Sequence, residues 1–228
     1  MNRLVQPELL DTLPPDDPGA VGSRRDLRRL NTLMGHQAIL IRAFQTHLHH
    51  VPKQITELGA GDGNFLFRLA QKTSPLWPDV KATLLDRQQS VPAETLAAFG
   101  QLGWRAEAVV VDVFDWSPEV NAAQVVIANL FLHHFEDARL AELLRKIAQH
   151  AEWFVAIEPR RFALPKLTGS LFRLMGCNRV TCHDAPASIR AGFAGREISA
   201  LWPDQQNWQL TERRAGLFSH FFSAQRRE

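Results

Sequence analysis

The sequence predicts an α/β fold with a mainly parallel sheet, and two observations support this. A short strand at residues 54–56 leads into a glycine-rich turn, and residues 64–70 begin a helix with an apolar face. Four more apolar runs follow at the spacing of βα units, and each ends in a polar side chain. The length of 228 residues fits one α/β domain, or such a core with a small appendage.

The glycine-rich turn, Glu57-Leu58-Gly59-Ala60-Gly61-Asp62-Gly63, indicates a bound ligand. Glycines at alternate positions allow positive φ angles and let a ligand approach the backbone closely. A dinucleotide-binding fingerprint has a further glycine three residues after Gly61, where this chain has Asn64. The turn therefore favours a cofactor other than NAD, and NAD stays open as a disfavoured alternative.

The apolar runs after this turn end in side chains that could bind a nucleoside. Residues 80–85 lead into Asp86 and Arg87. A carboxylate at this position can accept two hydrogen bonds side by side from ribose hydroxyls. The later runs end in the same way: residues 106–111 at Asp112 and Val113, residues 123–128 at Asn129 and Leu130, and residues 153–157 at Glu158.

The parts of the chain outside these repeats define two further regions. Residues 1–50 predict an N-terminal helical cap, with one helix starting at Ser23 and another over residues 35–50. Residues 161–195, rich in glycine and proline, predict an insertion after the fifth strand, on the substrate side of the sheet. A last helix over residues 197–202 and two strands over 208–212 and 217–224 complete the core, which spans residues 51–228.

Composition favours a small-molecule partner. The formal net charge is +2, and the arginine clusters at residues 24–29 and 213–227 are typical of solvated surfaces, so nucleic acid is not favoured. Cys177 and Cys182 make half a zinc site at most, which predicts no metal and reduced cysteines in a cytoplasmic protein.

No early apolar segment or 18-residue apolar run occurs, so we expect no membrane span. We expect a monomer or homodimer.

The acidic-x-Gly-x-Gly-x-Gly turn, followed by Asp86 and Asp112, resembles motif I and the later motifs of the class I S-adenosylmethionine (SAM) dependent methyltransferases. Over residues 50–228 this resemblance implies a Rossmann-like, seven-stranded, mostly parallel sheet whose last strand is antiparallel. It also implies SAM as cofactor and S-adenosylhomocysteine as product. The residues that it assigns to the cofactor are Glu57, Gly59, Ala60, Gly61, Asp86, Arg87, Asp112, Val113, Asn129 and Leu130.

Four side chains are candidates for acceptor chemistry. His133 and His134 follow the fourth strand, where a histidine could act as a general base, with His133 slightly favoured. The alternative is that both only hold the backbone. His183 and Arg190 lie in the predicted insertion and could contact substrate. The alternatives are that His183 is a structural loop residue and that Arg190 forms an ion pair with an acid on the surface. Because His183 and Asp184 are adjacent, we expect them not to pair with each other.

The resemblance is nearest to enzymes that methylate quinones, polyketides and similar small molecules. The chain lacks the Asn-Pro-Pro-aromatic or Asp-Pro-Pro-aromatic tetrapeptide of amino-methylating enzymes, and it lacks paired acids for a metal-dependent catechol site. Methylation of an aromatic hydroxyl with His133 as base is therefore the leading hypothesis. The alternatives are methylation of carbon or nitrogen, and a non-catalytic SAM-fold protein, which the intact motif I disfavours.

Overall fold

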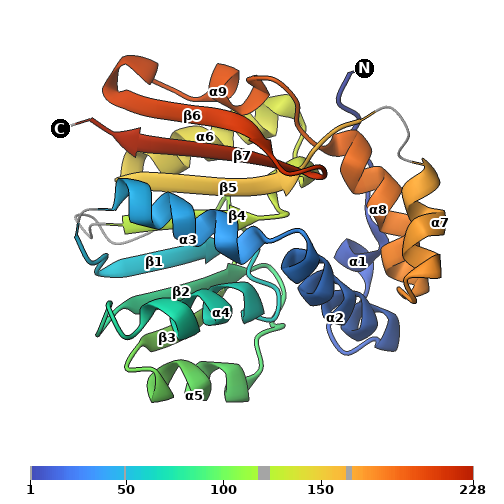
Figure 1. Ribbon diagram of the computed structural model, residues 1–228, viewed down its shortest axis with the longest axis horizontal. Helices are drawn as coiled ribbons and strands as arrows, with labels where there is room; N and C mark the ends of the chain where they lie inside the picture. Colours follow the sequence, from blue (N-terminus) through green and yellow to red (C-terminus); the bar gives the residue numbers. More distant parts are fainter. Residues whose placement is uncertain (1, 49, 118–123, 163–165, 228) are drawn as a thin grey trace.

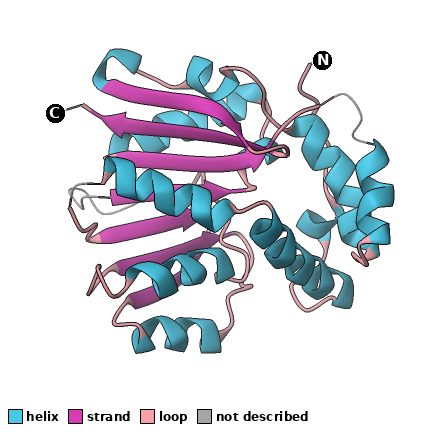
Figure 2. Cartoon of the chain, viewed as in Figure 1, coloured by secondary structure: helices cyan, strands magenta, loops and turns pink. Residues whose placement is uncertain are grey.

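The computed structural model describes residues 2–48, 50–117, 124–162 and 166–227, and it contains a seven-stranded sheet with the order β3-β2-β1-β4-β5-β7-β6 (Figures 1 and 2). Strands β1 to β5 are parallel, and β7 is antiparallel to both β5 and β6. The predicted fold class is confirmed. The strands are β1 (Gln54–Leu58), β2 (Lys81–Asp86), β3 (Arg105–Val110), β4 (Gln124–Asn129), β5 (Trp153–Pro159), β6 (Trp208–Ala215) and β7 (Ser219–Arg226).

Helices cover both faces of the sheet and its carboxyl edge (Figure 1). Helices α3, α4 and α5 pack on one face, and α6 and α9 pack on the other. Helices α1, α2, α7 and α8 lie beyond the carboxyl ends of the parallel strands. The helices are α1 (Leu9–Thr12), α2 (Pro18–Leu33), α3 (His36–His47), α4 (Asn64–Thr73), α5 (Ala93–Gln101), α6 (Asp137–His150), α7 (Lys166–Leu174), α8 (Arg179–Ala191) and α9 (Glu197–Leu201), with 3₁₀ turns η1 (Leu132–His134) and η2 (Gln205–Asn207).

The parallel register brings the predicted ligand-binding residues together. Leu58 of β1 is aligned with Leu85 of β2 and with Ala128 of β4, so the residues that follow these strands meet at one edge. The core on either side of the sheet fixes this register, because buried apolar side chains cover both faces of β1, β4 and β5. The site therefore has a rigid floor.

Helix α2 begins earlier than the sequence predicts. The Asp17 side chain accepts hydrogen bonds from the backbone N–H groups of Gly19 and Ala20, and Pro18 occupies the first turn, where its missing N–H costs nothing. Ser23 is instead buried inside α2, where its hydroxyl oxygen lies 3.1 Å from that of Thr181. The predicted helix start at Ser23 is therefore wrong.

The N-terminal segment and the predicted insertion form one layer over the sheet edge. Asp26 of α2 is buried and accepts hydrogen bonds from the backbone N–H of Asn178 (2.7 Å) and from the Thr181 hydroxyl (3.2 Å). Helix α3 packs Leu40 and Phe44 into the core of the sheet rather than over its edge. The division at residue 50 into a cap and a core stays a prediction. Residues 163–165 of the predicted insertion lie outside the described residues.

No helix in the described ranges combines the length and the apolar character that crossing a membrane requires.

We predict that Asp26→Ala lowers the free energy of unfolding by about 1–3 kcal/mol, because it removes the carboxylate that accepts from the backbone N–H of Asn178 and from the buried Thr181 hydroxyl. Denaturant titration of wild type and variant measures this loss. Asp16→Ala, at an exposed position on the same segment, serves as the control and should change stability little. Equal stability of the two variants would contradict the assigned role of Asp26.

Candidate active site

A cavity of about 510 Å³ lies at the carboxyl edge of the sheet, beneath helices α1, α2, α7 and α8. Its wall includes both predicted histidines, His133 and His134, and all of the residues that the resemblance assigns to a cofactor. These cofactor candidates are Glu57, Gly59, Ala60, Gly61, Asp86, Arg87, Asp112, Val113, Asn129 and Leu130.

The glycine-rich turn has the backbone that its sequence predicts. Gly59, Gly61 and Gly63 have φ angles of 67°, 55° and 72°, a region that other residues rarely adopt. At Gly59 there is also no space, because a Cβ atom would lie 2.2 Å from the ring of Phe131. Glycine at this position therefore satisfies a conformational and a steric requirement together.

Glu57 is a buried carboxylate at the floor of the cavity. It accepts a hydrogen bond from the backbone N–H of Leu66, and in the ranges that the structure describes no basic side chain forms an ion pair with it. Burial raises its pKa well above the usual range, and the charges of Asp62 and Asp86 act in the same direction. A cationic ligand beside this carboxylate would offset that cost.

Asp86 and Asp112 organise the loops that follow β2 and β3. The Asp86 carboxylate accepts hydrogen bonds from the backbone N–H groups of Gly61 and Gln88, both at 2.9 Å, and so joins the glycine-rich turn to β2. Asp112 accepts from the backbone N–H of Phe114, and Val113 is buried beside it. Each carboxylate keeps lone pairs that can accept further hydrogen bonds from a ligand.

A chain of three polar side chains crosses the cavity wall. His36 is fully buried, and its Nδ1 atom lies 2.7 Å from Oδ1 of Asn129 while its Nε2 atom lies 2.8 Å from Oγ of Ser219. The Asn129 amide nitrogen donates to Asn31, so the Asn129 oxygen faces His36 and accepts the Nδ1 proton. Nε2 of His36 is then free to accept the hydroxyl proton of Ser219.

Burial lowers the pKa of His36 to about 4, although the hydrogen bond with Asn129 and the charge of Glu158 act in the opposite direction. The imidazole is therefore neutral at physiological pH. A neutral ring that accepts a hydroxyl proton on one side and is oriented by an amide oxygen on the other has the arrangement of a general base.

His133 has a different environment. Its Nδ1 atom lies 2.8 Å from a carboxylate oxygen of Glu158, and its Nε2 atom lies 3.4 Å from Glu8. Burial alone would lower the pKa of His133, but Glu158 and Glu8 together raise it to about 10. Both ring nitrogens face carboxylates and the ring is charged at neutral pH, which argues against the predicted role of His133 as a base.

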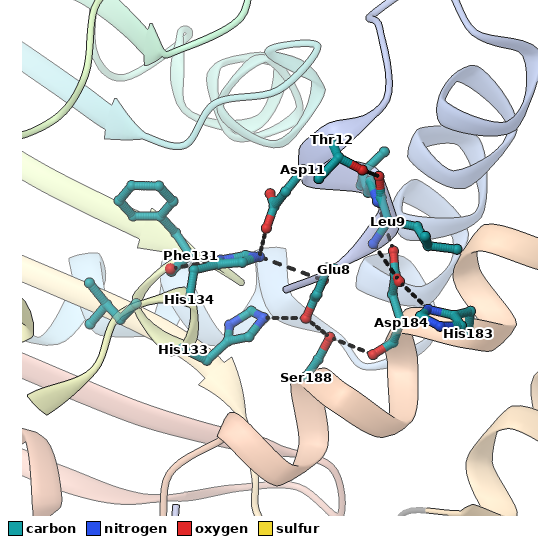
Figure 3. A network of polar contacts seen from close by, with 12 residues as sticks. Glu8, Leu9, Asp11, Thr12, Phe131, His133, His134, His183, Asp184 and Ser188 are labelled. Atoms are coloured by element: carbon teal, nitrogen blue, oxygen red, sulfur yellow. Dashed lines mark hydrogen bonds and ion pairs between the residues drawn. The ribbon is translucent and has the colours of Figure 1, made fainter. Parts of the chain in front are cut away.

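His134 lies beside His133 and also faces the N-terminal segment (Figure 3). Its Nδ1 atom lies 2.9 Å from the carbonyl oxygen of Phe131, and its Nε2 atom lies near Glu8 and Asp11 at 3.5 and 3.6 Å. Burial and the charge of His133 lower the pKa of His134, but Glu8 and Asp11 raise it overall. His134 is therefore also a weak candidate for a base.

The other two predicted substrate ligands, His183 and Arg190, are absent from the cavity wall. His183 is 57% exposed, and its Nδ1 atom lies 2.8 Å from Asp184, so the expectation that these adjacent residues cannot pair is wrong. The carboxylate of Asp184 also accepts from the backbone of Leu9 and Leu10, which ties α1 to α8. Arg190 donates to Gln6 on the surface. Neither residue lines the cavity, and their predicted contact with substrate stays a prediction.

Comparison with known proteins agrees with this geometry. A family described as a methyltransferase domain matches residues 55–152, which contain the glycine-rich turn, Asp86, Asp112 and Asn129. The chain therefore contains a methyltransferase domain. The search of curated proteins gave no significant match.

Three solved structures of similar fold place the methyltransferase among known proteins. The plantazolicin methyltransferase BpumL, in complex with S-adenosylhomocysteine, is 13% identical with a TM-score of 0.65, over 93% of this chain and 92% of BpumL. The SAM-dependent methyltransferase SibL is 17% identical with a TM-score of 0.61, over 90% of this chain and 58% of SibL. The pyocyanin biosynthetic protein PhzM is 18% identical with a TM-score of 0.55, over 81% of this chain and 53% of PhzM. This chain therefore spans little more than half the length of the last two.

Sequence reasoning about this methyltransferase missed Glu8, His36 and Ser219. Each reaches the cavity only through tertiary structure: His36 lies 93 residues from Asn129 and 183 from Ser219. Glu8 precedes the first helix, and nothing in its local sequence marks it. His36 is the first residue of α3 and is followed by another polar residue, Gln37, so its local sequence carries no signal either.

We predict that His36 makes the stability of the methyltransferase pH-dependent between about pH 6.5 and 4. Its folded pKa of about 4 lies below the unfolded value of 6.5, so the unfolded state binds the proton more tightly in this window. The free energy of unfolding should therefore fall as the pH falls, by up to about 3 kcal/mol from this residue.

Denaturant titrations at several pH values should give a shallower slope for His36→Gln than for wild type. His150→Gln, at the far end of α6, is the matched control and should keep the wild-type slope. Identical slopes for wild type and His36→Gln would contradict a neutral, buried His36.

Proposed function

We propose that this methyltransferase transfers the methyl group of SAM to a hydroxyl oxygen of an apolar, aromatic small molecule. The observation that supports this most strongly is the chain formed by Ser219, His36 and Asn129 on the cavity wall. It provides a neutral base beside a hydroxyl group. Such a group is useful for an oxygen nucleophile that must lose its proton, and it is unnecessary for a nitrogen nucleophile with a free lone pair.

We place the cofactor over the glycine-rich turn. Glu57, a buried carboxylate without a basic partner in the described residues, would interact with the cationic methionine part of SAM. Asp86 would accept hydrogen bonds from the ribose hydroxyls. Asp112 and Val113, at the end of β3, would contact the adenine amine and ring, and Asn129 lies between the cofactor side and the acceptor side.

The acceptor would occupy the part of the cavity beneath the helical layer. This part is lined by Leu30 of α2, Met34 directly after α2, Phe172 and Met175 near the end of α7, and Phe218 before β7. These side chains suit an aromatic ring with an apolar substituent, because they offer large contact areas and few groups that hydrogen-bond. The hydroxyl group of the acceptor would then point towards Ser219.

The reaction is an in-line displacement at the methyl carbon of the sulfonium. An oxygen lone pair attacks this carbon, the C–S bond breaks, and the sulfonium becomes the neutral thioether of S-adenosylhomocysteine. The acceptor proton passes to Ser219, whose own proton passes to Nε2 of His36. As the C–O bond forms, the oxygen proton becomes strongly acidic, so a base with a lowered pKa can accept it. Alignment and exclusion of water by the cavity supply the rest.

We predict that Asp86→Ala weakens the binding of SAM and of S-adenosylhomocysteine by about 1–3 kcal/mol, because two ribose hydroxyls lose a charged acceptor. Asp86→Asn keeps one acceptor oxygen and should give an intermediate affinity. Isothermal titration calorimetry of both ligands measures these affinities. Asp115→Ala, exposed and outside the cavity wall, is the control and should bind as wild type. Unchanged binding by Asp86→Ala would contradict the cofactor placement.

We predict that Ser219→Ala and His36→Gln each lower kcat by about 100-fold, towards a panel of alkyl-substituted phenols, while the Kd for SAM is unchanged. The loss should not be additive in the double variant, because the two residues act as one unit. His150→Gln again serves as control.

Mass spectrometry and NMR of the product locate the new methyl group. A methyl group found on carbon or nitrogen, or full activity of the Ser219→Ala variant, would contradict the proposed transfer to oxygen.

A further inference from the structure

Three potential metal ligands from distant parts of the chain converge at one side of the cavity (Figure 3). Glu8 comes from the segment before α1, and His133 and His134 come from the turn after β4. One ligand atom from each of the three lies within 4.8 Å of the others. Glu8 and His133 are buried, and His134 is partly buried.

Both imidazoles are oriented in the way that metal-binding histidines are. Nδ1 of His133 lies 2.8 Å from the carboxylate of Glu158, and Nδ1 of His134 lies 2.9 Å from the carbonyl oxygen of Phe131. Both Nδ1 atoms therefore carry a proton, and both Nε2 atoms face Glu8. In metal sites a ligating histidine usually donates its second N–H group to a carboxylate or a backbone carbonyl, which fixes the ring and increases its basicity.

The distances between these atoms fit a shared ion better than direct hydrogen bonds. Nε2 of His133 lies 3.4 Å from one oxygen of Glu8, and Nε2 of His134 lies 3.5 Å from the other oxygen and 3.6 Å from Asp11. A hydrogen bond between charged groups measures about 2.7–2.9 Å. Two ligands on a tetrahedral zinc ion, with bonds of about 2.0–2.1 Å, are separated by roughly 3.3–3.4 Å.

We propose that Glu8, His133 and His134 bind zinc or a similar divalent transition-metal ion, with Asp11, 3.6 Å from Nε2 of His134, as a supporting carboxylate beside the site. Two imidazole nitrogens favour this class over magnesium and calcium, which prefer oxygen ligands. The site departs from the prediction that the chain binds no metal, and it uses neither Cys177 nor Cys182.

A metal ion at this position would also have a structural effect. The ion would join the segment before α1 to the turn after β4, and it would thereby hold the helical layer against the sheet edge.

Metal binding can be measured without any assay of activity. Protein freed of metal with EDTA is titrated with Zn²⁺ in competition with a chromophoric chelator, and its melting temperature is recorded with and without Zn²⁺. We expect one ion per chain and a rise in melting temperature on binding. Glu8→Gln and His134→Gln should each weaken binding by at least ~100-fold, because losing a supporting residue alone costs about 10–100-fold.

A variant with Cys177→Ser, Cys182→Ser and His183→Gln removes both cysteines and the exposed histidine of α8, and it should bind Zn²⁺ as wild type does. If circular dichroism shows that the Glu8 and His134 variants are unfolded, the Asp11→Asn variant tests the proposal instead. We expect this variant to bind Zn²⁺ about tenfold more weakly than wild type. The proposal is overturned if wild type takes up less than one ion per chain, if the ligand variants bind as wild type, or if the cysteine variant loses binding.

Discussion

The buried carboxylate of Glu158, at the end of β5, is the interaction on which the site depends. It accepts hydrogen bonds from the backbone N–H groups of Phe131 (3.0 Å), Leu132 (2.8 Å) and His133 (3.3 Å), and it pairs with the His133 ring. A fully buried charge is costly unless such donors surround it. Here one side chain satisfies three backbone groups that leave the sheet after β4, and so it determines the path of that turn.

The position of this turn has consequences on both sides of the cavity. Leu130 adopts a φ angle of 55°, and Phe131 then lies so close to Gly59 that only glycine fits there. The turn after β4 is thus packed against the turn after β1. On the other side, the same turn presents His133 and His134 to the N-terminal segment. Cofactor-side and acceptor-side residues are therefore held by one short stretch of backbone.

The sheet and its ligand-binding edge could be predicted because their signals are local. Glycines at positions 59, 61 and 63 need positive φ angles, and parallel strands bring the residues after them to one edge whatever the rest of the chain does. The catalytic roles of individual side chains could not be predicted from local sequence in the same way. His133 has the residue type of a base, but its charge state depends on Glu158 and Glu8, which lie 25 and 125 residues away.

The same limit applies to the polar chain across the cavity wall. His36 begins a helix that otherwise packs on the core, and Ser219 begins a strand, so neither position suggests chemistry by itself. Burial lowers the pKa of His36 and so keeps the ring neutral, and the amide oxygen of Asn129, on the side of the ring opposite Ser219, fixes its orientation.

The antiparallel direction of β7 determines how Ser219 reaches the site. Because β7 is antiparallel to β5, Ser219 is aligned with Pro159. The first residue of β7 therefore lies at the edge of the sheet where the parallel strands end. The hairpin between β6 and β7 therefore ends at the active edge, with the half-exposed Phe218 at its tip lining the cavity. Hairpin tips accept changes in length and sequence more readily than sheet interiors do. Selection for new acceptors, natural or in the laboratory, can therefore act on residues 216–218 while the glycine-rich turn stays intact.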